Sequence, residues 1–276
     1  MTILDGKRIK EEKLIEIKKE IESLERRPGI AVIQVGNNEA SNVYIKNKEN
    51  TAKRLGCNFT HIKFKEDVLE EDILNKIDEL NVDKNIDGIL IQMPISKHLN
   101  TSLIQNRVIA NKDIDGLTDV NAGLLVHNKT CHIPCTPKGI LEMLNYYNID
   151  LKGKHVVVVG RSELVGKPLL NLMLNNNATV TVCHSYTSNL KSITTLADIL
   201  IVAVGKERMI TSDMVKDGAV VIDVGINRVD GKLYGDVDFD NVKDKCSYIT
   251  PVPGGVGQTT VLSLYQNLLK AYSLNR

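Results

Sequence analysis

The stretch VVVVGRSELVGKP, residues 156–168, decides the fold class of this chain. Its run of valines is typical of a strand buried on both faces of a parallel sheet. The chain then turns at Gly160, and the apolar spacing from Leu169 to Leu174 predicts a helix. A glycine turn before a helix N-terminus can bind phosphate, because the backbone approaches the anion and free N–H groups point at it. An ordinary βαβ unit without a ligand is the alternative, since Gly160 and Gly166 make only a weak glycine pattern.

The residues around the next strand favour NADP over NAD. Residues 178–183 predict this strand, and a dinucleotide fold meets the adenosine ribose just past its end. A site for NAD usually places an acidic residue there, but no acid occurs between Glu163 and Asp198. Arg161 and Ser185 are instead placed to hold a 2′-phosphate.

Composition excludes several classes of protein. The 276 residues suffice for one large domain or two ordinary ones, and the apolar content of 42% is ample for a core. A net charge of +1 gives no electrostatic footprint for nucleic acid. No apolar run reaches about 18 residues, so we expect no membrane span, and the N-terminus lacks the apolar run of a signal peptide.

The cysteine and histidine residues predict neither disulfides nor a metal site. The five cysteines are scattered, and reduced thiols in a cytoplasmic enzyme are the expectation. Cys131 and Cys135 are not accompanied by a second pair of ligands, and the histidines show no metal spacing.

Strands alternate with helices from residue 30 onward, which predicts an α/β fold with parallel strands. The predicted strands are 30–35, 59–64, 88–93, 156–159, 178–183, 199–204 and 219–224, and the predicted helices are 5–27, 40–55, 69–80, 136–147, 169–174 and 260–272. Residues 111–137 are irregular and polar, which favours a binding loop. Thr136 is expected to cap the next helix and Pro137 to fit its first turn. Residues 250–257 predict a rigid loop.

Polar residues in three places are candidates for chemistry. Tyr44 and Lys48 are four apart in a predicted helix and share a face, although a solvated lysine is the alternative. Gln92 ends a buried strand, where ligands of open α/β sheets collect, unless its amide is satisfied by the backbone. Asp113 and Asp115 precede a glycine, as in an ordinary turn. In a binding loop, such a carboxylate can grip a guanidine-like edge, for example that of a pterin, by two hydrogen bonds.

Taken together, these segments resemble the bifunctional methylenetetrahydrofolate dehydrogenase/cyclohydrolase family over nearly the whole chain. The matching residues are 35–37 (VGN), 41–48 (SNVYIKNK), 91–95 (IQMPI), 112–116 (KDIDG), 121–123 (NAG), 134–139 (PCTPKG), 160–162 (GRS), 165–168 (VGKP), 183–185 (CHS), 223–227 (DVGIN), 235–237 (GDV) and 250–257 (TPVPGGVG). Residues 41–48 match the Ser-x-x-Tyr-x-x-x-Lys helix of the family. So many ordered matches are far more specific than any single motif.

The resemblance implies two domains with folate in the cleft between them. Residues 1–136 and 261–276 would form an α/β catalytic domain, to which the C-terminal helix returns. Residues 137–260 would form a Rossmann-like NADP-binding domain, through which two subunits form a homodimer.

The resemblance also implies roles for single residues. The catalytic group would be Lys48 with its partner Gln92, Tyr44 as the residue that stacks on the substrate, and Asp115 as the pterin anchor. The remaining contacts would be Pro253, Gly254 and Gly255 to folate, and Gly160, Arg161, Ser162, Ser185 and Ile226 to NADP. One departure concerns Gln258 and Thr259, where the family usually has Pro-Met. Without the fixed φ of a proline, we expect this loop to be more mobile.

The expected activity is oxidation of 5,10-methylenetetrahydrofolate to 5,10-methenyltetrahydrofolate with NADP, followed by hydrolysis to 10-formyltetrahydrofolate. Such an enzyme would serve one-carbon metabolism and purine biosynthesis in the cytoplasm. Hydrolysis would need a neutral Lys48, which burial beside a cationic substrate favours. The alternatives are a dehydrogenase without cyclohydrolase activity, a shikimate-dehydrogenase-like oxidoreductase, and an NADP-binding regulatory subunit.

Overall fold

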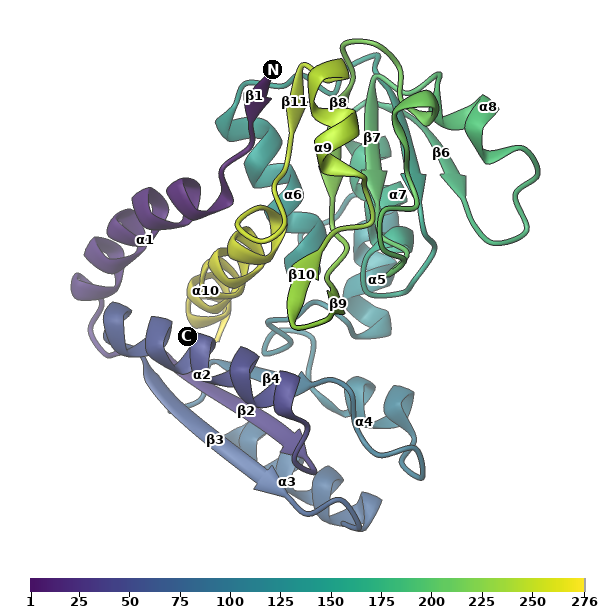
Figure 1. Ribbon diagram of the computed structural model, residues 1–276. Coiled ribbons are helices and arrows are strands. Elements are labelled where there is room, and N and C mark those ends of the chain that lie inside the picture. The colour runs from purple at the N-terminus through teal and green to yellow at the C-terminus, as the bar shows by residue number, and fades with distance from the viewer. Residues whose placement is uncertain (276) are drawn as a thin grey trace. The chain divides into compact units, whose positions relative to one another are not determined.

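The computed structural model describes residues 1–275. The chain divides into two compact units. Unit 1 comprises Met1–Glu11 and Thr136–Ser263, and unit 2 comprises Glu12–Cys135 and the residues from Leu264 onward. Two helices run from one unit into the other, namely α1 (Gly6–Glu22) and α10 (Val256–Leu274). Figure 1 labels these elements along the chain.

Unit 1 is built on a parallel sheet in the order β1-β11-β8-β7-β5-β6. Its strands are β1 (Thr2–Ile3), β5 (His155–Val159), β6 (Thr179–Cys183), β7 (Ile199–Val202), β8 (Val220–Asp223) and β11 (Tyr248–Ile249). The valine run occupies β5, which pairs with β6 on one side and β7 on the other. Its burial on both faces follows from this inner position.

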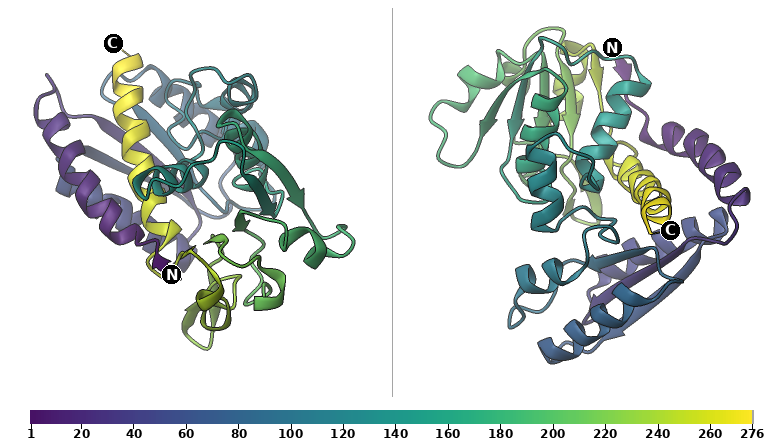
Figure 2. Two further views of the ribbon diagram at one scale, coloured as in Figure 1. Left: turned by 90° about the horizontal axis from the view of Figure 1, so that it is seen from above. Right: turned by 180° about the vertical axis from the view of Figure 1, so that it is seen from behind.

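Helices cover both faces of this sheet (Figure 2). The helical segments of unit 1 are α6 (Cys135–Tyr146), α7 (Gly166–Asn175), α8 (Leu190–Thr194), η1 (Ser212–Met214), α9 (Phe239–Val242) and η2 (Lys243–Lys245). One face packs against apolar residues of α8, η1 and α9, while α6 and α7 lie behind the other face in Figure 1. A short antiparallel hairpin, β9 (Asn227–Val229) with β10 (Lys232–Tyr234), follows β8.

Unit 2 contains a smaller parallel sheet in the order β3-β2-β4. Its elements are β2 (Gly29–Val35), α2 (Glu39–Leu55), β3 (Asn58–Phe64), α3 (Glu70–Val82), β4 (Gly88–Gln92), α4 (Thr101–Arg107) and α5 (Asp119–Val126). An apolar cluster joins one face of the sheet to α3 and α4. Helix α2 ends at Gly56, whose φ of 80° is the left-handed conformation expected of a glycine cap.

The α/β fold with parallel strands is confirmed, and three local predictions are corrected. Residues 111–137 are not irregular throughout, because α5 forms there once the Thr118 hydroxyl accepts a hydrogen bond from Asn121 N. Helix α6 already begins at Cys135, so Thr136 lies inside the first turn and does not cap it. Helix α10 begins at Val256, four residues before its expected start, and takes in Gly257.

Several elements carry no periodic signal in the sequence. Strands β1 and β11 are two residues long, too short to show a period; backbone pairing holds both, and Ile249 of β11 also joins the apolar core of unit 1. Among the described residues, none of the helices has both the length and the apolar character to cross a membrane.

Candidate functional site

Helix α2 presents Lys48 to the end of strand β4. The helix begins where the Asn38 side chain accepts a hydrogen bond from Ser41 N at 3.0 Å. Lys48 is half-buried, and its Nζ donates to Gln92 Oε1 at 2.8 Å. Tyr44 lies one turn earlier on the helix, and its side chain is 42% exposed. The structure therefore brings Lys48 and Gln92 into direct contact and leaves the Tyr44 ring accessible.

Gln92 is held in one orientation. It is 8% exposed, and its Nε2 donates to the carbonyl oxygen of Met93 at 2.8 Å. The amide is thus satisfied partly by the backbone and partly by Lys48. Because the nitrogen is bound to the backbone, the oxygen faces the lysine amine.

The two neighbouring aspartates have different surroundings. Asp113 accepts hydrogen bonds from Gly116 N at 2.9 Å, Thr118 N at 2.8 Å and Asn121 Nδ2 at 2.9 Å. These bonds use the Asp113 carboxylate to shape the loop. Within residues 1–275, Asp115 makes no such set of backbone bonds, so its carboxylate is the one available to a ligand.

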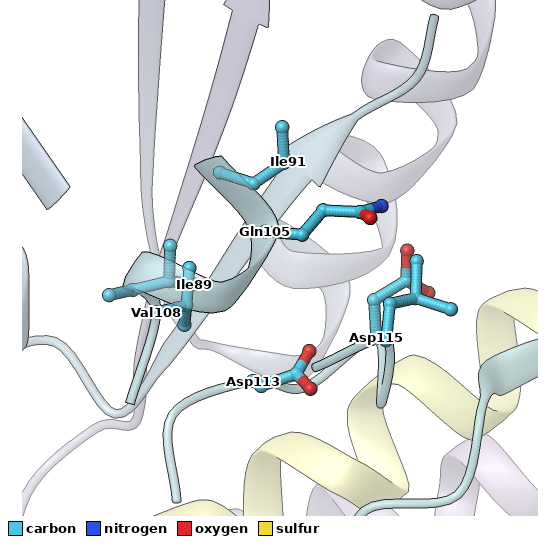
Figure 3. A pocket seen from close by; sticks show the side chains of 7 residues that line it. Ile89, Ile91, Gln105, Val108, Asp113 and Asp115 are labelled. Atoms are coloured by element: carbon cyan, nitrogen blue, oxygen red, sulfur yellow. The ribbon is translucent and has the colours of Figure 1, made fainter. Parts of the chain in front are cut away.

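Asp115 lies on the wall of a pocket within unit 2, shown in Figure 3. The pocket is lined by Ile89, Ile91, Gln105, Val108, Asp113, Asp115 and Leu117. In Figure 3 the Gln105 amide points toward the side of the pocket where Asp115 lies. In this pocket the Asp115 carboxylate lies beside four apolar side chains and can accept hydrogen bonds from the edge of a ligand.

The charges of Lys48 and Asp115 are shifted in opposite directions. Burial lowers the pKa of Lys48, while the attraction of Asp115 and the proximity of Cys135 oppose this shift. Burial raises the pKa of Asp115, the charge of Lys48 opposes this, and Asp113 adds to it. Both shifts favour the neutral forms, so burial prepares this pair for proton exchange with a bound substrate.

Sequence reasoning missed Cys135 as part of this cluster. The thiol is buried, donates to Ile114 O at 3.4 Å, and forms a hydrogen bond to Asp115 that lowers the pKa of that carboxyl. The sequence signal that could have identified Cys135 is its place in the segment 134–139, which resembles the family.

Sequence reasoning also missed two residues of α10 whose side chains donate hydrogen bonds to the backbone near Lys48 and Asp115. The Tyr265 hydroxyl donates to the backbone oxygen of Lys48. Asn267 Nδ2 donates to Ile114 O and to Ile133 O, both at 2.9 Å. Neither residue has a distinguishing sequence pattern, because buried polar positions in a helix are evident only from the fold.

In unit 1, the turn after β5 leaves no space for a side chain at either of its two glycines. Gly160 has a φ of 127°, and a Cβ there would lie 2.3 Å from Ala203 O. A Cβ on Gly166, at the start of α7, would lie 2.2 Å from Gly160 O. Ser162 Oγ accepts from Val165 N at 3.2 Å and orders the turn. This strand, turn and helix fit the phosphates of a dinucleotide.

The other expected cofactor residues follow the carboxyl ends of neighbouring strands. Arg161 follows β5, Ser185 follows β6 and Ile226 follows β8, and all three are exposed. Ligands of open α/β sheets bind along this edge, so the residues fit NADP.

Two buried carboxylates hold the loops along this edge. Asp236 accepts from the backbone N–H groups of Val204, Gly205 and Lys206 at 2.7, 3.0 and 2.8 Å. Asp223 accepts from Gly225 N at 3.0 Å and from Asp236 N at 2.9 Å. Burial raises the pKa of Asp223 to about 6, against the effect of its backbone donors.

The expected folate residues Pro253, Gly254 and Gly255 belong to unit 1. Gly254 has a φ of 112°, and its carbonyl oxygen accepts a hydrogen bond from Lys7 N at 3.2 Å. Gln258 lies in the first turn of α10, and its N–H donates to Gly255 O at 3.1 Å.

A dinucleotide-binding α/β unit, joined to an α/β unit with a half-buried lysine and carboxylate, defines a nucleotide-dependent enzyme with an acid–base site. Two family descriptions match the chain. Residues 4–115 match "Tetrahydrofolate dehydrogenase/cyclohydrolase, catalytic domain", and residues 134–276 match its "NAD(P)-binding domain".

Known proteins are similar over the same length. The Bifunctional protein FolD of Bacillus anthracis is 49% identical over 273 residues, which cover 98% of this chain and 96% of the relative. The FolD structure from Campylobacter jejuni has a TM-score of 0.99 with 41% identity, and 100% of both chains is covered. A Trypanosoma brucei FolD structure, complexed with NADP cofactor and inhibitor, has a TM-score of 0.95 and 32% identity, with 99% of this chain and 98% of that chain covered. The chain belongs to the tetrahydrofolate dehydrogenase/cyclohydrolase family.

Proposed function

We infer that the protein oxidises 5,10-methylenetetrahydrofolate to 5,10-methenyltetrahydrofolate with NADP and hydrolyses the product to 10-formyltetrahydrofolate. Family membership over the whole chain supports both activities and does not favour a monofunctional dehydrogenase, a shikimate-dehydrogenase-like enzyme or a regulatory subunit. The observation that carries the residue assignment is the contact between Lys48 Nζ and Gln92 Oε1 beside Asp115.

The oxidation requires alignment more than acid–base chemistry. Bound NADP would supply the hydride acceptor, and the protein's own task is to align the substrate carbon with it. We assign its binding to Gly160, Arg161, Ser162, Ser185 and Ile226. Gly160 lets the backbone approach the phosphates, and Arg161 with Ser185 binds the 2′-phosphate.

The hydrolysis depends on Lys48. Water must attack the cationic methenyl carbon, and a neutral amine can take a proton from that water. The bond between this carbon and N5 then breaks, N5 takes up a proton, and the carbon stays on N10 as the formyl group. Burial already lowers the pKa of Lys48, and a cationic substrate lowers it further. Gln92 orients the amine through its fixed oxygen, and Tyr44 stacks on the substrate ring.

The substrate ring is assigned to Asp115 and to the loop before α10. The Asp115 carboxylate accepts hydrogen bonds from the amino edge of the pterin. We assign Pro253, Gly254 and Gly255 to folate binding from the family resemblance, and none of the three carries a long side chain.

Replacing Lys48 by Met tests this assignment. We expect hydrolysis of methenyltetrahydrofolate to fall about a hundredfold or more, the usual contribution of an acid–base group, while oxidation falls much less. The appearance and decay of the methenyl chromophore measure both steps, and NADPH formation measures the first. Hydrolysis at the wild-type rate would refute the role of Lys48.

A control lies on the same helix. Lys46 is exposed and pairs with Glu49 at 3.0 Å, so Lys46→Met removes a cation from α2 without touching Gln92. Both activities should stay at the wild-type level. Loss of hydrolysis in both variants would assign the effect to the charge of the helix and not to the amine of Lys48.

We further propose that the protein forms a homodimer through unit 1 and acts in the cytoplasm, supplying one-carbon units to purine biosynthesis. Strand β6 supports the dimer, because β5 is its only strand neighbour within residues 1–275. An unpaired strand edge is a ready template for pairing with a second chain. Sedimentation analysis of the purified protein should give twice the mass of one chain, and a monomer would refute this proposal.

A further inference from the structure

We propose that Tyr186 determines the preference for a 2′-phosphorylated nucleotide by holding the Arg161 guanidinium in place. Tyr186 directly follows Ser185 in the loop after β6, and its side chain is 81% exposed. The Arg161 guanidinium carbon lies 5.6 Å from the centroid of its ring. This distance is within the range of a cation–π contact. The inference rests on the proposed role of Arg161.

The loop holds the backbone of Tyr186 by hydrogen bonds, and its ring has one aromatic contact. His184 N donates to Thr187 Oγ1, and Thr187 N donates to His184 O, both at 2.8 Å. Tyr186 N donates to His184 Nδ1 at 3.2 Å, and the His184 ring meets the tyrosine ring edge-on, with centroids 6.2 Å apart. The exposed ring is therefore carried at the tip of a closed turn and not on a free segment.

The guanidinium keeps its hydrogen-bond donors for an anion. Within residues 1–275, the side chain of Arg161 contacts the ring of Tyr186. The nearby carboxylate of Glu163 is occupied by Lys167 at 3.1 Å. Stacking on a ring uses the face of a guanidinium and leaves the N–H groups of its edge free.

Prior stacking reduces the cost of binding. An arginine that must be ordered by its ligand loses rotamer freedom at that moment, which weakens affinity. A ring that already orients the guanidinium removes part of this loss. An exposed cation–π contact corresponds to about a two- to fivefold change in affinity, and this change applies only to ligands that bind the guanidinium.

Calorimetric titration of the intact protein tests the inference without any measurement of activity. The probes are adenosine 2′,5′-bisphosphate, which has the 2′-phosphate, and AMP, which lacks it. Tyr186→Ala should weaken binding of the bisphosphate about two- to fivefold and leave AMP binding unchanged. Tyr186→Phe keeps the ring and should restore wild-type affinity. If Tyr186→Ala weakened the binding of the bisphosphate and the binding of AMP equally, the inference would be overturned.

A double-mutant cycle separates this inference from the role of Arg161 on which it rests. Arg161→Ala alone should weaken bisphosphate binding selectively, and an unchanged affinity would refute the role of Arg161. In the Arg161→Ala background, Tyr186→Ala should have no further effect. Full additivity would show that the ring acts independently of Arg161 and would overturn the inference.

The chain offers a matched control. Arg208 lies over the ring of Tyr234, with 4.5 Å between the guanidinium carbon and the ring centroid. Tyr234→Ala removes a cation–π contact of the same kind from unit 1. In this variant, the ratio of the affinity for adenosine 2′,5′-bisphosphate to the affinity for AMP should stay at its wild-type value. A change in this ratio as large as that caused by Tyr186→Ala would overturn the specific role of Tyr186.

Discussion

Lys48 and Asp115 illustrate how burial prepares two side chains for proton transfer. In each residue, burial is the largest cause of the pKa shift, and it disfavours the charged form. Their mutual attraction works in the opposite direction, since each charge stabilises the other. The balance between the two effects sets the pH at which Lys48 becomes neutral, and this balance can be changed by one substitution.

Asp115→Asn should shift the pH dependence of hydrolysis. The Asp115 carboxylate raises the pKa of Lys48, so its removal lowers that pKa further. If hydrolysis requires neutral Lys48, the acidic limb of kcat against pH moves to lower pH. The measurement is kcat at saturating methenyltetrahydrofolate, because loss of the pterin anchor raises KM. The exposed variant Asp119→Asn should leave the limb in place, and a shift of Asp115→Asn to higher pH would contradict the coupling.

At the residue scale, the sequence identifies side chains whose type and position both indicate chemistry. Tyr44 and Lys48 share a helix face, and Gln92 ends a strand, so these could be predicted. The sequence could not separate Asp113 from Asp115, because only the fold shows which carboxylate the backbone uses. Tyr265 was hidden for a related reason, since its partner is a backbone atom more than two hundred positions away.

At the scale of elements, the loops after β7 and β8 depend on close packing around Asp236. Gly225 lies in the loop after β8, and a Cβ on it would lie 2.2 Å from Asp236 Cγ. The same carboxylate accepts hydrogen bonds from the loop after β7. A displaced Asp236 would therefore disturb both loops of the nucleotide edge.

Gly225→Ala should lower the free energy of unfolding by about 1–3 kcal/mol, the usual cost of overpacking, and raise KM for NADP. Gly123→Ala is the matched control. Gly123 lies inside α5 with no atom within 4 Å of an added Cβ, so alanine should stabilise the helix by about 0.5–1 kcal/mol. Calorimetry should show shifts of the melting temperature in opposite directions. An unchanged melting temperature for Gly225→Ala would contradict the packing argument.

Element boundaries were predicted less well than element types. The parallel strands that form the centre of each sheet were found because they are apolar runs, as in β5. Helices α5 and α10 were missed or shortened because Gly123 and Gly257 interrupt their helical pattern. Glycine lowers helix propensity, but capping and burial outweighed it here.

At the scale of the whole molecule, side chains of α10 hold the backbone segments that carry Lys48 and Asp115. Asn267 is buried and donates to the carbonyl oxygens of Ile114 and Ile133. Ile114 directly precedes Asp115, so these hydrogen bonds fix the segment that carries the carboxylate. Removing the Asn267 amide leaves the carbonyl oxygens of Ile114 and Ile133 without the hydrogen bonds that it donates.

Asn267→Leu should lower kcat of both reactions about tenfold, since one lost orienting contact of 1–2 kcal/mol has this effect. Binding of adenosine 2′,5′-bisphosphate should not change, because the residue lies in unit 2. Ser273→Ala is the control, since the hydrogen bond that the Ser273 hydroxyl donates to Leu269 O, at 3.2 Å, lies within α10. Wild-type kcat in Asn267→Leu would show that α10 does not hold the Asp115 segment.

The contacts of Tyr265 and Asn267 also have a consequence for synthesis of the protein. The ribosome completes every strand of both sheets by Ile249, before it adds the residues from Leu264 onward. A nascent or prematurely terminated chain without those residues has all its strands but lacks the supports of Lys48 and Asp115. Synthesis of the strands of the nucleotide-binding sheet therefore precedes synthesis of the residues that support Lys48 and Asp115.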